Sequence, residues 1–309
     1  MERKALVQWN RRQGWNPEVD ANLDETSRRE ARNSRQSRLD LAGVVHGSDY
    51  IEESNLYDTG FALASLRALG ADPPRRKELE SWLSAQRDSL GEESSLSALW
   101  AYERSARFLG LDPGAAESGP IERALVGFLL PSPDKLPSCD AGDLLRDLHR
   151  LSELSSWRNW SPSSSWRRRL AELLETLRGR SGVFPREHEN LVGCWQAFAV
   201  ARAFAIPMDE KPLLDFARER LAYAEARGFL STEAESLEGV RSGLEILAAF
   251  SHPLEGRPKA TLVFQVEACQ AASGGFGRRI GAIPTLEDSY YGVSSLLLLE
   301  GAPSPPGTG

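Results

Sequence analysis

The sequence predicts an all-α protein, an α/α toroid in which six helical hairpins form an inner ring and an outer ring of helices. Three observations lead to this prediction: apolar helical segments alternate with amphipathic ones, the alternation repeats about every 46 residues, and glycine–aromatic turns recur between repeats. With 309 residues, 41% of them hydrophobic, the chain is long enough to bury the core that such a fold requires.

The helical pattern begins at residues 57–70, which are apolar on most faces and end at Gly70, a typical C-terminal cap. Residues 75–86 follow, with Leu79 and Leu83 at helical spacing and charges elsewhere, which predicts an amphipathic helix with one solvent-facing side. The same contrast recurs with apolar segments at 97–110, 143–154, 193–206, 239–250 and 288–300, and amphipathic or mixed segments at 120–130, 165–178, 211–226 and 258–272.

The starts of the apolar segments give the period and the number of repeats. Six such segments begin near Asp58, Ser97, Asp143, Gly193, Gly239 and Asp288. Six helix pairs are the number that closes a ring of inner helices inside a ring of outer ones. An open stack would require polar caps at both ends, whereas the last segment is among the most apolar, so closure is expected.

Similar turns separate the later repeats. Outer segments end at residues 182–184 (Gly-Val-Phe), 228–230 (Gly-Phe-Leu) and 274–276 (Gly-Gly-Phe). Glycine adopts the left-handed conformation that ends a helix, and the aromatic side chain then packs back against that end. Because a polar loop and an inner segment follow each turn, we expect the N-termini of the inner helices to point toward one end of the ring.

The composition limits the classes of partner and the compartment. A net charge of −7 argues against nucleic-acid binding through overall charge. The three cysteines, Cys139, Cys194 and Cys269, are widely spaced and odd in number, which indicates neither a disulfide framework nor a paired-cysteine zinc site. A reducing, cytoplasmic compartment is therefore expected. No apolar run reaches the roughly 18 residues of a membrane span, so no transmembrane segment is expected.

Three regions are expected along the chain. Residues 1–45 are polar and rich in arginine, which is typical of a peripheral or partly disordered segment. The toroid is expected to occupy residues 46–302, and residues 303–309 are expected to form a disordered tail. The N-terminus lacks the apolar stretch of a signal peptide.

The last repeat carries the clearest motif. Residues 268–270 (Ala-Cys-Gln) lead into 274–277 (Gly-Gly-Phe-Gly) and then 287–291 (Glu-Asp-Ser-Tyr-Tyr). This stretch resembles the prenyltransferase/squalene-oxidase repeat, which builds the β-subunits of protein prenyltransferases and the triterpene and class II terpene cyclases. In the spacing of its repeats, the resemblance extends over residues 57–301. It implies an α/α toroid whose inner helices line an apolar, often aromatic pocket for isoprenoid chains.

The resemblance also implies two kinds of chemistry, neither of which this sequence matches fully. Class II cyclases protonate an alkene with an Asp-x-Asp-Asp run, which is absent here. Protein prenyltransferases bind zinc through Asp-x-Cys and a histidine; residues 191–195 resemble the cysteine-bearing segment and place Cys194 at the thiolate position. Val192 stands where the aspartate would be, and residues 236–239 carry no histidine. The cofactor therefore stays open between zinc, magnesium and none.

Candidate site residues follow from their places on the inner segments. Glu287 and Asp288 open the last segment, where they would protonate a substrate or hold a pyrophosphate through magnesium, or else only cap the helix. A ring of such carboxylates at the pocket mouth would raise one another's pKa. The candidate substrate-binding residues, which would otherwise be plain core, are the inner-segment aromatics Phe61, Trp100, Tyr102, Trp195, Phe198, Tyr290 and Tyr291.

Cys194 is the candidate metal ligand. It lies at a helix start, where the helix dipole favours thiolate, although a buried small residue is the alternative. His188, just upstream, and Cys139 with Asp140 are conceivable further ligands. Their spacings match no known metal motif.

Three functions from different classes remain after these steps. The first is an isoprenoid-processing enzyme, similar to a prenyltransferase or terpene cyclase, that binds a prenyl chain in the central apolar pocket. The second is a non-catalytic toroid that binds a lipid or a protein partner. The third is a six-hairpin glycosidase, which works with two carboxylates. The expected ligand is an isoprenoid or another apolar small molecule, and a β-subunit-like protein would also need a helical partner subunit.

Overall fold

The computed structural model describes residues 55–91, 94–111, 119–131, 141–227, 236–271 and 274–301. All of them belong to one compact unit of the chain, Leu41–Gly309. The described residues form eleven α-helices and no strand beyond two isolated β-bridges, which confirms the prediction of an all-α protein. The expected N-terminal segment (1–45) and tail (303–309) lie outside the described residues.

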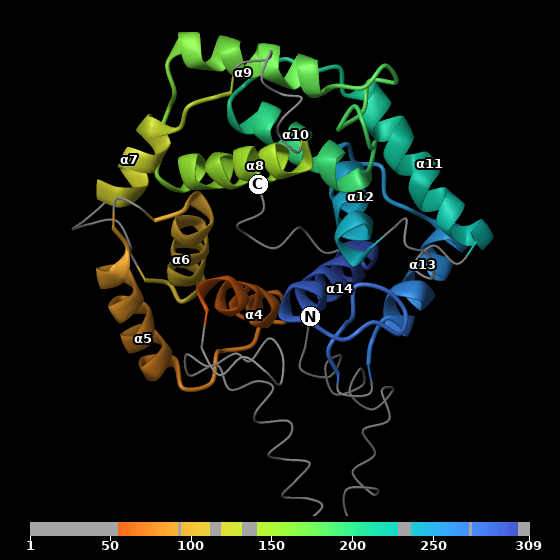
Figure 1. Cartoon of the computed structure of the whole chain (residues 1–309). Coiled ribbons are helices and arrows are strands. Elements are labelled where there is room, and N and C mark those ends of the chain that lie inside the picture. The colour runs from red at the N-terminus through yellow and green to blue at the C-terminus, as the bar shows by residue number, and fades with distance from the viewer. Residues whose placement is uncertain are drawn as a thin grey trace, which may run out of the picture. The chain divides into compact units, whose positions relative to one another are not determined.

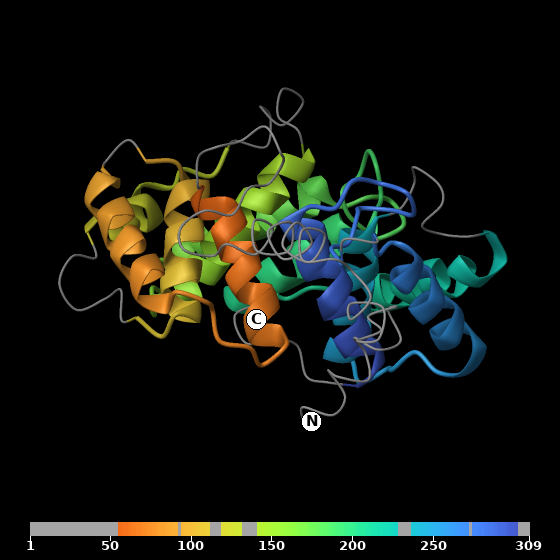
Figure 2. The same ribbon diagram turned by 90° about the horizontal axis from the view of Figure 1, so that it is seen from below.

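Six helices lie next to one another around a common centre (Figures 1 and 2). Each packs against the next one in chain order, and the last packs against the first, so the contacts return to their starting point. These inner helices are α4 (Leu56–Ala68), α6 (Leu96–Phe108), α8 (Ala141–Trp157), α10 (Leu191–Ala203), α12 (Leu237–Ala249) and α14 (Leu286–Leu299).

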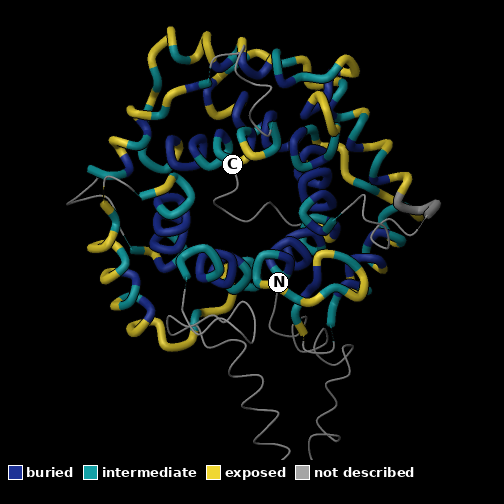
Figure 3. Tube along the Cα trace, in the orientation of Figure 1, coloured by how far each residue is buried: buried dark blue, intermediate teal, exposed yellow. Residues whose placement is uncertain are grey.

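Five further helices lie on the outside of the inner ones (Figure 1). They are α5 (Arg76–Ser89), α7 (Gly119–Gly127), α9 (Ser164–Leu177), α11 (Lys211–Arg227) and α13 (Gly256–Ala268). Figure 3 shows exposed residues along their outer sides and buried residues on the inner helices. In α9, for example, Leu170, Leu173, Leu174 and Leu177 are buried at helical spacing while the intervening charged residues face water. The alternation of apolar and amphipathic segments predicted this division.

The glycine turns at residues 182–184 and 274–276 have the same backbone geometry. Gly182 and Gly274 have φ angles of 88° and 92°, a region that favours glycine. The N–H of Gly182 donates to the carbonyl of Gly179 at 3.0 Å, and that of Gly274 to the carbonyl of Ala271 at 2.8 Å. The two turns are 92 residues apart, about two periods of the sequence repeat. The third expected turn, 228–230, lies outside the described residues.

The aromatic residue of each turn connects it to the next inner helix. The carbonyl of Phe184 accepts the N–H of Asn190 at 3.0 Å, and that of Phe276 accepts the N–H of Thr285 at 3.2 Å. The Phe276 ring lies against Gly292 of α14, where a Cβ atom would be only 2.6 Å from the ring. The Phe276 ring thus packs on the inner helix that follows its turn.

Five inner helices begin with a side-chain cap that accepts the backbone N–H three residues further on. The caps are Asn55, Ser95, Asn190, Ser236 and Thr285. The caps are therefore not the acidic residues that the sequence suggested, since those follow the caps by two or three positions.

A membrane-spanning helix, which requires length and sustained apolar character together, does not occur among the described residues.

Candidate functional site

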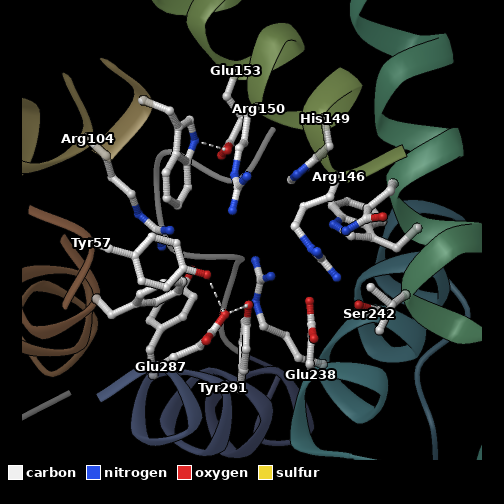
Figure 4. A pocket seen from close by; sticks show the side chains of 17 residues that line it. Tyr57, Arg104, Arg146, His149, Arg150, Glu153, Glu238, Ser242, Glu287 and Tyr291 are labelled. Carbon is white, nitrogen blue, oxygen red and sulfur yellow. Dashed lines mark hydrogen bonds between the residues drawn. The ribbon is translucent and has the colours of Figure 1, made fainter. Parts of the chain in front are cut away.

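A cavity lies where the six inner helices face one another (Figure 4). It holds about 580 Å³ of empty space, part of it open to solvent. Six aromatic side chains line it: Tyr57, Phe61, Trp100, Trp195, Tyr290 and Tyr291. Eight ionisable side chains of other kinds share the wall: Arg104, Arg146, Arg150, Arg241, His149, Glu153, Glu238 and Glu287. The wall is therefore aromatic, as expected, and it also carries four arginines, which the sequence analysis did not predict.

The register of the inner helices explains which residues reach the cavity. In four of them the second helical residue lines it: Tyr57 in α4, Val192 in α10, Glu238 in α12 and Glu287 in α14. The residue four positions further on, which lies on the same face of a helix, lines it in all four, and the residue three positions further on lines it in α10, α12 and α14. The N-caps fix this register, because each sets where its helix begins.

Glu287 is held by two tyrosines. The hydroxyl of Tyr57 donates to Oε1 of Glu287 at 2.8 Å, and the hydroxyl of Tyr291 donates to the same oxygen at 3.0 Å. Hydrogen bonds to an ionised acceptor are stronger than neutral ones, so this arrangement stabilises the carboxylate. Burial and the charge of Glu287 both raise the pKa of Tyr57, which keeps that hydroxyl a donor.

Glu238 lies at the matching position of the neighbouring helix but in different surroundings. It is half-buried and makes no hydrogen bond or ion pair with any described residue. Burial, together with the negative charge of Glu287, raises the pKa of Glu238. Figure 4 shows both side chains reaching into the cavity from its lower wall. Glu238 is thus the carboxyl group that tends to keep its proton.

Helix α8 supplies the opposite side of the cavity. Arg150 pairs with Asp147, with 3.2 Å between Nη1 and Oδ1, and Arg146 pairs with Asp143. Burial lowers the pKa of His149, so that imidazole is neutral near pH 7. Cationic and neutral nitrogens from α8 therefore face the two carboxyl groups from α12 and α14.

Two further carboxylates of the inner helices already have partners. Glu153 accepts the indole N–H of Trp100 at 2.6 Å. Glu245 forms a buried salt bridge with Arg241, with 2.9 Å between Oε1 and Nη2. These contacts hold the Trp100 ring and the Arg241 guanidinium in place. They also provide the partners that buried charged groups require.

Arg104 lies among aromatic rings. Its guanidinium carbon is 4.6 Å from the ring centre of Phe61, 4.8 Å from that of Trp100 and 4.9 Å from that of Tyr290. These are cation–π distances. Rings that the sequence analysis assigned to the substrate are thus already in contact with a cation of the protein itself.

Most of the candidate residues chosen from the sequence do meet in the cavity. Those that line it are Glu287, Phe61, Trp100, Trp195, Tyr290 and Tyr291. Asp288 does not line it. Its carboxylate accepts the hydroxyl of its own N-cap, Thr285, at 2.7 Å, and burial raises its pKa. Asp288 therefore lies at the helix start, beside Glu287 but outside the cavity wall.

Tyr102 and Phe198 also lie away from the cavity wall. Tyr102 packs in a separate apolar cluster with Leu63 and Leu79. The ring of Phe198 packs against Phe250, with 5.2 Å between the ring centres. Both residues are on inner helices, but on the faces turned away from the centre, where they fill the core.

Cys194 is a buried packing residue. The backbone N–H of Phe184 donates to its sulfur at 3.4 Å, and burial raises the pKa of the thiol to about 12. No three His, Cys, Asp or Glu side chains of the described residues lie close enough to hold a metal ion. His188 is exposed, and Cys139 and Asp140 lie outside the described residues.

The residues that sequence reasoning missed are further titratable ones on inner helices: Arg104, Arg146, His149, Arg150, Glu153 and Arg241. Glu238 belongs to the carboxylates that were expected at the pocket mouth. One signal for the missed residues existed. On α8, Arg146, His149, Arg150 and Glu153 follow the spacing of three and four residues that marks one helix face.

The chain matches no protein-family model and no curated protein.

Proposed function

We propose that the closed circuit of helices is the α/α toroid of six hairpins that the sequence predicts, and that its cavity is the site of an acid–base enzyme. Glu238 serves as the proton donor, and Glu287 serves as the ionised partner. The closing contact between α14 and α4 supports the ring. The two carboxyl groups in one cavity support the chemistry.

The observation that carries this proposal is the unequal environment of two equivalent carboxyl groups. Glu238 and Glu287 occupy the same helical position on neighbouring helices. Glu287 accepts two hydroxyl hydrogen bonds, whereas Glu238 has none from the described residues and has a raised pKa. Pairs of titratable groups whose surroundings differ in this way mark the acid and the base of many enzymes.

The reaction that suits this pair is acid-assisted cleavage of a glycosidic type of bond. Glu238 gives its proton to the leaving oxygen as the carbon–oxygen bond breaks. Glu287 stabilises the positive charge that develops at the carbon. Water then forms the new carbon–oxygen bond and gives its proton to the Glu238 carboxylate, which restores the acid. This reaction is that of a six-hairpin glycosidase, the third of the functions that remained after the sequence analysis.

Carbocation chemistry on a bare hydrocarbon receives less support from the cavity. Such a cation is stabilised by the faces of aromatic rings. Here Arg104 already contacts the rings of Phe61, Trp100 and Tyr290. A second cation in that place would face the guanidinium charge as well as the rings.

An isoprenoid ligand is the second candidate, in the form of a prenyl diphosphate. Six aromatic side chains would contact the prenyl chain, and four arginines line the same cavity. Arginine binds phosphate oxygens in a bidentate way. The resemblance to the prenyltransferase repeat supports this candidate too.

The experiment compares hydrolysis of alkyl and 4-nitrophenyl glycosides and glycuronides by wild type, Glu238→Gln and Glu287→Gln. Loss of a general acid lowers rates by about 10²–10⁴-fold. The loss for Glu238→Gln should be smaller with 4-nitrophenol, because that leaving group departs without protonation. Glu287→Gln should impair both substrate types equally. Asp288→Asn, next to Glu287 but outside the cavity, is the matched control and should keep wild-type rates.

Other outcomes point elsewhere. Wild-type turnover by Glu238→Gln would contradict the acid–base assignment. Diphosphate release from farnesyl diphosphate, together with no glycoside turnover, would favour the prenyl diphosphate. Ligand binding without turnover of either class would favour the non-catalytic toroid.

A further inference from the structure

Arg104 is the most unusual charged residue of the cavity. Its side chain extends from α6 toward the cavity, and only 5% of the residue is exposed. The three rings described above contact it, and the ring of Phe108 lies 5.7 Å from the guanidinium carbon. The rings fix the position of the guanidinium without neutralising its charge, since they carry no net charge.

The other three arginines of the cavity have carboxylate partners. Arg241 pairs with Glu245, Arg150 with Asp147 and Arg146 with Asp143. Arg104 forms no ion pair and no hydrogen bond with any described residue, and its Nε is buried without an acceptor. A guanidinium has five N–H donors, and ring faces accept none of them in its plane. Arg104 is therefore a buried cation whose partner is missing from the described part of the chain.

More hydrogen-bond donors of the same wall lack an acceptor. The indole nitrogen of Trp195 and the hydroxyl of Tyr290 are buried and unpartnered within the described residues, and so is Nε of Arg241. All three residues line the cavity. Buried polar groups in proteins are nearly always hydrogen-bonded, to protein, water or ligand. The wall thus has an excess of donors, which an oxygen-rich ligand would satisfy.

We propose that the cavity binds an organic molecule that carries one carboxylate and several further oxygen acceptors, such as an acidic sugar, and that Arg104 receives the carboxylate. The link between this subsite and the catalytic roles of Glu238 and Glu287 rests on the function proposed above. Binding of the carboxylate to Arg104 does not require turnover. A guanidinium and a carboxylate form two parallel hydrogen bonds, which suits a cation held rigidly between rings.

The number of charges decides between a carboxylate and a diphosphate. Among the four arginines of the cavity, only Arg104 has no ion pair within the described residues, so a single carboxylate is enough to serve as its partner. A diphosphate carries at least two negative charges and would bring the second one close to the carboxylates of Glu153 and Glu287. Like charges in a partly buried site repel strongly. A single carboxylate therefore fits the wall better.

Isothermal titration calorimetry on the full chain tests the proposal with four probes: glucuronate, glucose, inorganic phosphate and inorganic diphosphate. Glucuronate should bind more tightly than glucose, which has the same ring without the carboxylate. Arg104→Met keeps a long apolar side chain among the rings and should weaken glucuronate binding about thirtyfold or more. Arg67→Met is the matched control, since Arg67 also lies over the Phe108 ring but outside the cavity wall. It should bind glucuronate as wild type does.

The melting temperature of the ligand-free variants separates recognition from a structural role. Because Arg104→Met removes an uncompensated buried charge, it should melt at or above the wild-type temperature. Arg104→Lys, which keeps a charge without the planar fork, should bind glucuronate with intermediate affinity.

Three results would overturn the proposal: no saturable glucuronate binding by wild type, undiminished binding by Arg104→Met, or tighter binding of diphosphate than of glucuronate. The proposed acid–base function is judged by a different variant. Glu238→Gln should keep glucuronate binding while losing turnover. If its turnover persists, the acid–base assignment fails and the Arg104 subsite stands.

Discussion

Glu287 and Asp288 are adjacent in the sequence, yet their side chains have different surroundings. Successive residues of an α-helix are rotated by about 100°, so only one of the two faces the cavity. Glu287 meets the hydroxyls of Tyr57 and Tyr291, and Asp288 returns to the cap at Thr285. The position of the N-cap, Thr285, determines which of the two residues faces the cavity. A capping box of threonine followed three residues later by an acid was readable in the sequence and indicates Asp288 as the structural residue.

The raised pKa of Glu238 predicts a pH-dependent stability. In the folded state this group binds its proton more tightly than in the unfolded state, where the ordinary value is 4.5. Wild type therefore loses stability as pH rises through the folded pKa. Glu238→Gln should be more stable than wild type at neutral pH, because it removes the ionised form that burial and Glu287 disfavour.

Urea unfolding of both proteins across a range of pH measures this difference. The advantage of Glu238→Gln should shrink as pH falls toward 4.5 and vanish below it. Glu187→Gln, at an exposed loop position, serves as the control and should show no such trend. An advantage of Glu238→Gln that is constant with pH would contradict the assigned proton.

Burial of Cys194 predicts an unreactive thiol. With a pKa of about 12, the thiolate fraction at pH 8 is about one in ten thousand. In a Cys139→Ser background, Cys194 and Cys269 should not react with a thiol reagent while the chain is folded, and both should react in denaturant. Rapid modification of Cys194 in the folded protein, read by mass spectrometry, would restore it as a candidate metal ligand.

At the scale of helices and turns, the sequence carried much of the information. The period, the outer leucine stripes and the glycine turns predicted the helices, and the turn geometry at Gly182 and Gly274 repeats in the structure. Some boundaries differ, as at α7, which ends at Gly127 although the pattern extended to residue 130. Helix ends depend on tertiary packing, which periodicity alone does not contain.

Alanine substitution at two glycines of the last repeat should lower the stability of the chain for different reasons. Gly292→Ala would place a Cβ 2.6 Å from the Phe276 ring, so the turn and α14 must move apart. Overpacking of this kind costs about 1–3 kcal/mol. Gly274→Ala meets no atom within 4 Å and is disfavoured only by its φ of 92°, at about 1–2 kcal/mol.

Gly127→Ala is the control for both variants. Gly127 lies in α7, has an ordinary φ and meets nothing within 4 Å. Its replacement should stabilise the chain by about 0.4–1 kcal/mol. Chemical unfolding of the three variants measures these values, and a neutral Gly292→Ala would show that Phe276 does not anchor the turn to α14.

At the scale of the whole helical unit, the cavity exists only because the last inner helix meets the first. The hydroxyl of Tyr57 in α4 reaches Glu287 in α14 across 230 residues of sequence. No local pattern indicates which charges of six separate helices will share one space, so the aromatic wall was predicted and the arginines were not. The sequence around a charged residue on an apolar inner helix gives no reason for the charge. The reason appears only when the helices together form the cavity wall.

The proposed closure of the helices into a ring predicts how the chain unfolds when the junction between α4 and α14 is weakened. The Phe61 ring lies 5.6 Å from that of Tyr290 and 5.7 Å from that of Tyr291, between α4 and α14. Phe61→Ala should lower the free energy of unfolding by about 3–5 kcal/mol. Because a ring has no free end, the loss should shift the whole transition, with circular dichroism and tryptophan fluorescence still coincident.

Phe204→Ala is the matched comparison for Phe61→Ala. Phe204 is equally buried, but its ring packs on Trp160 and Trp166, away from the cavity. Both variants should lose similar stability, while only Phe61→Ala should also weaken glucuronate binding, because Phe61 positions Arg104. In an open stack, Phe61 would belong to a terminal repeat, and its loss would produce an early partial transition while the main transition stayed in place. That result would contradict closure of the ring.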